Sequence, residues 1–142
     1  MKSIAAIAAF CSLLTLFGCA TTQDLTPAQE AFLAAAMATP LTFTMPTSQV
    51  DEAWARAQSF VTRFSPMQIQ PLTPHVIRTQ NPTSATSAFG YYVRKIPKGG
   101  ETQFTVECLC AGMNPSQPSI RNAHILAYYM KTGNLDPSLV SR

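Results

Sequence analysis

The strongest pattern of hydrophobic and polar positions in the chain spans residues 49–64 and has the period of an amphipathic α-helix. Its apolar side chains fall within about 120° of a helical wheel, and charged and hydroxyl side chains cover the opposite side. We expect Ser48 to be the N-cap, with Asp51 three residues later, and Pro66 to end the helix. Trp54 lies centrally among the apolar positions, which favours core packing over a binding role. The apolar set is Val50, Ala53, Trp54, Ala57, Phe60, Val61 and Phe64.

Further along the chain the pattern changes to the alternation of β-strands. Residues 88–96 and 102–110 each place apolar side chains on one face and more polar side chains on the other. Residues 97–101 contain a proline and two adjacent glycines, a composition typical of a hairpin loop. We therefore predict an antiparallel hairpin. Its apolar face carries Phe89, Tyr91 and Val93 from the first strand and Phe104, Val106, Cys108 and Cys110 from the second.

Two weaker segments also have strand character. Residues 67–72 and 75–80 alternate, but Pro71 and Pro74 interrupt them, so we expect one bent or edge strand there. Residues 41–45 alternate between two prolines and fit a short edge strand.

A second long helix is predicted over residues 118–132, with Gly133 as its stop signal. Two interpretations of its more polar side are open: a solvated surface, or a basic contact surface for lipid phosphates or an acidic partner. A shorter helix is predicted to begin at Pro27, with Thr26 as N-cap and Gln29 completing a capping box, and to end before Pro40. The polar side of the longer helix carries Arg121, His124, Tyr128 and Lys131.

Together these elements predict an α+β fold. One sheet face and two helical stripes can bury one another, which gives a small two-layer sandwich. We expect an antiparallel sheet of about three strands packed by two amphipathic helices, in the order α-β-β-β-α, preceded by a short helix and a tether.

The amino terminus has the composition of an export signal. Lys2 supplies a positive charge, and residues 4–17 form a largely apolar run that is too short to span about 30 Å of hydrocarbon comfortably. The run leads into a cysteine that follows a small residue and has an aliphatic residue three positions before it. This motif, Leu16-Phe17-Gly18-Cys19, resembles the lipobox of bacterial lipoproteins.

The resemblance implies that signal peptidase II recognises Leu16 and Gly18 and cuts before Cys19, after the Cys19 sulfur has received a diacylglyceryl group. It divides the chain into a signal peptide, residues 1–18, a lipid-anchored tether with a short helix, residues 19–47, and a globular domain, residues 48–142. By resemblance to enterobacterial sorting, Ala20 after the cysteine implies the outer membrane, facing the periplasm. The alternative is an ordinary secretory peptide cut after Ala20, which leaves a soluble protein.

Cys108 and Cys110 form a Cys-x-Cys pair with three open interpretations. Secretion into an oxidising compartment makes a local or intermolecular disulfide plausible, although positions i and i+2 on a regular strand are nearly 7 Å apart. Two small buried hydrophobic residues explain the same pattern. Metal binding with His124 or His75 is the third interpretation, but the spacing of a four-ligand zinc site is missing. We expect no metal centre and no cofactor.

Composition and motifs limit the possible functions. The formal net charge of +3 is small and its basic residues are dispersed, which argues against nucleic acid as a partner. The sequence contains neither a nucleophile elbow nor a phosphate-binding glycine loop, so we do not expect an enzyme. The expectation is a membrane-anchored, noncatalytic interaction or scaffolding component of an envelope assembly. The alternative is a periplasmic lipoprotein that binds a small molecule or a metal.

Overall fold

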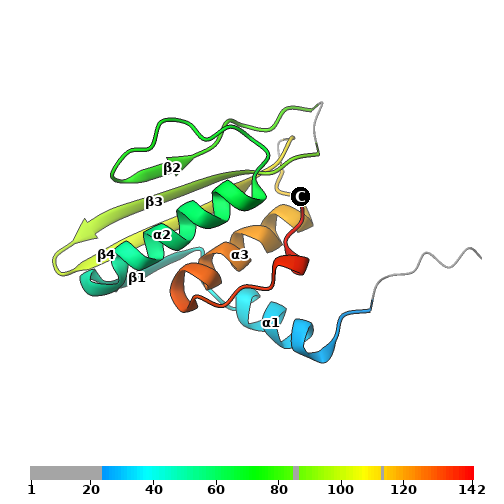
Figure 1. Ribbon diagram of the computed structural model, residues 1–142, viewed down its shortest axis with the longest axis horizontal. Coiled ribbons are helices and arrows are strands. Elements are labelled where there is room, and N and C mark those ends of the chain that lie inside the picture. The colour runs from blue at the N-terminus through cyan, green and yellow to red at the C-terminus, as the bar shows by residue number, and fades with distance from the viewer. Residues whose placement is uncertain (1–23, 85–86, 113) are drawn as a thin grey trace, which may run out of the picture.

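A computed structural model describes residues 24–84, 87–112 and 114–142 of the chain. The helices and strands of these residues form two layers (Figure 1). None of the helices in the described ranges is long and apolar enough to cross a membrane. In chain order the elements are α1 (Pro27–Met37), β1 (Thr42–Pro46), α2 (Thr47–Phe64), β2 (Val76–Arg78), β3 (Gly90–Lys98), β4 (Glu101–Leu109), α3 (Gln117–Thr132) and a 3₁₀ turn (Pro137–Leu139).

The sheet is antiparallel throughout, with the strand order β1-β4-β3-β2. The α+β two-layer prediction is confirmed, but the sheet has four strands rather than about three. The additional strand is β1, which confirms the short edge strand predicted over residues 41–45 and pairs with β4 from Thr42 opposite Thr105 to Pro46 opposite Glu101. Both β1 and α1 lie within residues 19–47, the range that the sequence assigned to the tether.

The predicted hairpin connects β3 to β4 through a turn tighter than the five-residue loop expected. Pro97 and Lys98 still pair with β4, so only Gly99 and Gly100 remain between the strands. Their φ angles are 48° and 93°. A two-residue turn with positive φ at both positions matches the right-handed twist of the flanking strands, and glycine adopts it without a steric penalty.

The core lies between the sheet and the helices α2 and α3, as the alternation predicts. In Figure 1 the two helices lie over one face of the sheet. The Trp54 ring packs 6.4 Å from the Phe104 ring, and Phe60 meets Tyr91 edge-on at 5.6 Å. The predicted apolar stripe of α2 is buried along its full length.

The start of α2 differs from the prediction. The helix begins at Thr47, and Ser48 lies inside its first turn, so Ser48 is not the N-cap. Thr47 instead donates hydrogen bonds from both its backbone N–H and its hydroxyl to the Gly100 carbonyl, at 3.3 and 2.8 Å. The Gly100 carbonyl therefore accepts from an N–H at this end of the helix that has no partner within the helix, and the helix has no side-chain cap.

The polar side of α3 is mostly covered, so the interpretation as a solvated surface does not hold for most of it. Helix α1 packs against this side, where Phe32 meets Tyr128 edge-on at 5.3 Å. His124 Nδ1 lies 2.8 Å from the Thr39 carbonyl oxygen. Sequence periodicity identified the polar positions correctly but could not show that α1 folds back onto them. The capping box predicted at the start of α1, between Thr26 and Gln29, is present.

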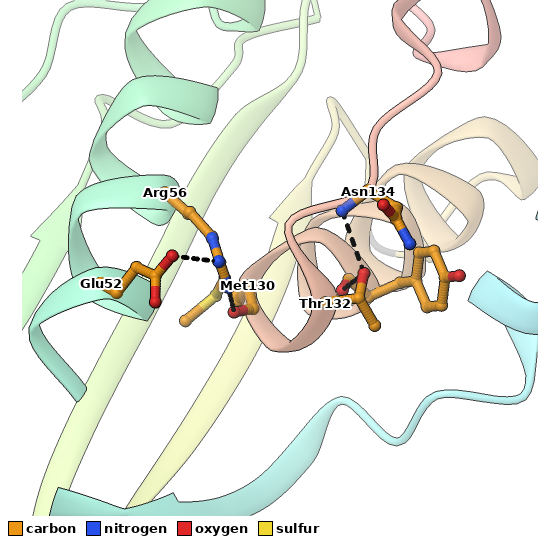
Figure 2. A network of polar contacts seen from close by, with 6 residues as sticks. Glu52, Arg56, Met130, Thr132 and Asn134 are labelled. Atoms are coloured by element: carbon orange, nitrogen blue, oxygen red, sulfur yellow. Dashed lines mark hydrogen bonds and ion pairs between the residues drawn. The ribbon is translucent and has the colours of Figure 1, made fainter. Parts of the chain in front are cut away.

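A side-chain bridge joins α2 to the end of α3 (Figure 2). The Arg56 guanidinium forms an ion pair with Glu52 one turn away on α2 and donates a 3.0 Å hydrogen bond to the Met130 carbonyl. The last carbonyls of a helix have no partner within the helix and carry its negative dipole end, so a cation is favourable there. Gly133, with a φ of 77°, ends α3 as predicted.

Candidate functional site

The predicted lipidation site lies outside the described residues. Leu16, Gly18 and Cys19 all precede residue 24, so cleavage and lipidation remain predictions from the sequence. The described chain begins with Asp24 and Leu25 and enters α1 at Pro27.

The Cys-x-Cys pair lies where β4 ends and the chain turns toward α3. Cys108 is the cross-strand partner of Tyr91, and Cys110 follows the last residue of β4. Both thiols are free and half-buried, and both pack against the core. The alternation that predicted a shared face for them is therefore correct.

The surroundings of Cys108 oppose ionisation. Burial raises the pKa of the Cys108 thiol to about 12, although a hydrogen bond from Tyr91 acts in the opposite direction. Burial also raises the pKa of the Tyr91 phenol. Cys108 is therefore a protonated, weakly reactive thiol at neutral pH.

The surroundings of Cys110 favour ionisation. The backbone N–H of Ser116 and the Ser119 hydroxyl donate hydrogen bonds that lower the pKa of the Cys110 thiol, and partial burial opposes them. Ser116 is the N-cap of α3, so the sulfur lies at the positive end of the helix dipole. The thiol also lies 3.6 Å from the Asn114 carbonyl oxygen. Two cysteines that look equivalent in the sequence thus differ in acidity.

Neither histidine joins these cysteines. His124 faces α1, where its ring contacts the Thr39 carbonyl, and His75 lies exposed just before β2. Among the described residues no three His, Cys, Asp or Glu side chains are grouped as a metal site would require. The interpretation of a metal site formed by the Cys pair with His75 or His124 therefore finds no geometric support.

An apolar hollow of about 260 Å³ adjoins Cys108. It lies between the end of β4 and the first turns of α3, and Leu41, just before β1, also lines it. The hollow exists because β1 pairs with β4 only as far as Thr105, with one further bond from Val106 N–H to the Leu41 carbonyl. Its apolar lining consists mainly of Leu41, Val106, Leu109, Pro115, Ile120 and Ala123.

Strand β1 forms one outer edge of the sheet. In an antiparallel pair, every second residue hydrogen-bonds to the partner strand. Because Val106 N–H donates to the Leu41 carbonyl, Phe43 and Met45, two and four residues after Leu41, also direct their backbone N–H and C=O groups to β4. Thr42 and Thr44 then direct theirs outward, and in the described part of the chain neither forms another backbone hydrogen bond. An edge of this kind can accept a strand from another chain.

Asn122 is a structural residue that the sequence analysis did not identify. It is fully buried, donates to the Tyr91 hydroxyl at 3.2 Å and to the Ser141 carbonyl at 2.8 Å, and accepts from Ser141 N–H at 3.0 Å. It thereby fastens the C-terminal segment over the core. A polar amide next to the apolar arc of α3 was the available sequence signal.

Comparison with known proteins gives no family assignment. The chain matches no family model and shows no significant similarity to a curated protein or to a solved structure.

Proposed function

We propose that this protein is a lipid-anchored lipoprotein of the bacterial cell envelope, at the outer membrane and facing the periplasm, which acts by noncatalytic binding within an envelope assembly. The observation that carries the proposal is the apolar run of residues 4–17 that leads into Leu16, Gly18 and Cys19. A thiol at the cut site is the group to which the diacylglyceryl chain is attached.

The arrangement of the described domain supports an anchored mode of action. Only a short segment separates Cys19 from α1, which begins at Pro27. At about 3.5 Å per residue, such a segment reaches at most about 25–30 Å when extended. An anchor would hold the domain close to the lipid surface and raise its local concentration there, so weak contacts with a membrane-associated partner would suffice.

The edge of β1 offers a physical route to such a partner. Thr42 and Thr44 present outward backbone groups, and their side chains are exposed. A partner strand could pair with them without disturbing the hydrogen bonds from β1 to β4.

The anchor is tested by replacing Cys19 with serine and feeding cells a radiolabelled fatty acid. We expect the label and membrane retention to be lost, because serine lacks the thiol that accepts the diacylglyceryl group. Cys11→Ser is the matched control, since it makes the same change within the apolar run and leaves the motif intact. Normal labelling of the Cys19→Ser protein would refute the proposal.

The binding mode is tested by purification in mild detergent after crosslinking. If a partner adds a strand to β1, Thr44→Pro should release it, because proline removes an outward N–H. Thr44→Ala should retain the partner, because the backbone donor remains. Equal retention by both variants would exclude strand addition at this edge.

A further inference from the structure

The sheet face opposite α2 and α3 carries a polar cleft of about 290 Å³. Its polar side chains on the strands are Arg78 from β2, Tyr92 from β3 and Glu107 from β4. Asn81, just after β2, and Leu109, at the end of β4, complete the described lining. Its volume is just below the usual range of ligand sites, about 300–1,000 Å³, and it combines an aromatic ring with convergent polar groups.

Sheet register explains why these side chains meet. Arg78 is directly opposite Tyr92, and Tyr92 is directly opposite Glu107. Directly opposed residues of an antiparallel sheet point to the same face. The three side chains therefore form one row across the strands, in which the arginine and the glutamate flank the ring. The Cα atoms of Arg78 and Glu107 are two strand spacings apart, or roughly 10 Å.

The two charges in this row are not neutralised within the described domain. Its only ion pair is that between Glu52 and Arg56. Arg78 has a single long contact, 3.5 Å to Asn81 Oδ1, and in the described residues neither Tyr92 nor Glu107 forms a side-chain hydrogen bond. The cleft thus presents a positive end and a negative end with an aromatic surface between them.

Each end selects one kind of group. A guanidinium and a neighbouring amide bind oxyanions through charge-assisted hydrogen bonds. A carboxylate beside an aromatic ring binds an ammonium group, which the face of the ring also attracts. Glu107 disfavours a simple anion and Arg78 disfavours a simple cation, because like charges in one cleft repel. Arg94, exposed on the same face one row away, adds to the positive potential near Arg78.

We propose that this cleft binds a small zwitterion, with its oxyanion held by Arg78 and Asn81 and its ammonium group held between Tyr92 and Glu107. The proposal does not depend on lipidation, because every group that it uses lies in the described domain. It gives the domain a ligand in addition to its proposed role in an envelope assembly. Two sources share this chemistry: a soluble metabolite and the headgroup of a zwitterionic phospholipid.

The test measures binding to the full chain in detergent micelles by isothermal titration calorimetry. The probes are O-phosphoethanolamine, which carries both charges, ethyl phosphate, which carries the anion, and ethylammonium, which carries the cation. We expect the zwitterion to bind at least about tenfold more tightly than either half, equivalent to about 1.4 kcal/mol. Equal affinities for the three probes, or no binding of any of them, would overturn the proposal.

Variants assign the two ends of the ligand. Arg78→Gln should remove the advantage of the zwitterion over ethylammonium, and Glu107→Gln should remove its advantage over ethyl phosphate. Lys98→Gln and Glu101→Gln remove one charge of each sign at the hairpin end of β3 and β4, six residues along the strands from Tyr92 and Glu107, and should leave binding within about twofold of the parent. A thermal melt checks that each variant is folded. If the two control variants weaken binding as much as Arg78→Gln and Glu107→Gln do, the charges act only through long-range electrostatics and the proposed site is refuted.

Competition identifies the source of the zwitterion. Vesicles of phosphatidylethanolamine that displace O-phosphoethanolamine from the protein would assign the cleft to a lipid headgroup. Undiminished binding of the soluble probe in their presence would assign it to a soluble ligand. Vesicles of phosphatidylglycerol are the matched control, because that headgroup lacks the ammonium group, and displacement by these vesicles as well would contradict the role of Glu107.

Discussion

At the scale of single residues, the two thiols show how position decides chemistry. Cys108 lies on β4 against Tyr91, where burial raises the pKa of its thiol to about 12. Cys110 lies two residues further on, where donors at the start of α3 lower the pKa of its thiol. The sequence predicted that they share a face, which is correct, but gave no means of distinguishing them. Their difference arises because α3 returns to the end of β4.

Alkylation of the full chain with iodoacetamide tests this difference. The thiolate is the reactive form, so a lowered pKa extends reactivity to lower pH and a raised pKa delays it to higher pH. At pH 7 we expect Cys110 to be modified well before Cys108, with Cys108 reacting appreciably only as the pH approaches 12. Peptide mass spectrometry over a pH series measures both. Equal rates at neutral pH would show that the two surroundings are equivalent.

At the scale of elements, helix ends depend on contacts that are distant in sequence. The capping box of α1 is local, with Gln29 three residues after Thr26, and was predicted correctly. The start of α2 was predicted two residues too late, because the partner of its first residue, Thr47, is the Gly100 carbonyl in a hairpin that follows much later in the chain. The end of α3 combines both kinds of contact, a local glycine and the guanidinium of Arg56 from α2.

The bridge between α2 and α3 provides a matched pair of substitutions. Arg56→Gln should lower the free energy of unfolding by about 1 to 2 kcal/mol, because it removes a charge-assisted hydrogen bond to the Met130 carbonyl. Glu52→Gln should change it by less than about 0.5 kcal/mol, because the Glu52 side chain is 68% exposed. Urea denaturation measures both. If Glu52→Gln has the larger effect, the ion pair rather than the carbonyl contact stabilises the bridge.

At the scale of the whole molecule, the sheet gains one strand on each side of the predicted hairpin, β1 beside β4 and β2 beside β3. Strand β1 precedes α2 in sequence but lies beside β4, and helix α1 covers the side of α3 that the pattern left open. These contacts join residues 27–46 to the rest of the domain. The periodicity of the sequence identified each of these elements. It could not predict which element each one packs against, because that depends on which sheet edge and which helix face the rest of the fold leaves uncovered.

Native-state hydrogen exchange tests the position of β1 at the sheet edge. We expect the Phe43 and Met45 amides to exchange slowly, because they pair with β4, and the Thr42 and Thr44 amides to exchange quickly, because they point outward. NMR spectra recorded after transfer to heavy water compare the four amides within one strand. Protection of Thr42 and Thr44 as strong as that of Phe43 would mean that another strand covers this edge.

The sequence by itself determined the helices, the hairpin, the inward-facing side chains and the α+β class, because each follows from the spacing of apolar residues over a few turns or strand residues. It also supplied the lipobox resemblance, which lies outside the described residues. Only the tertiary structure decided that β1 pairs with β4, that Cys110 meets the start of α3, and that Arg78, Tyr92 and Glu107 stand in one row. Strand register and helix docking bring together residues that are far apart in the chain, and the period of a single segment carries no information about its neighbour.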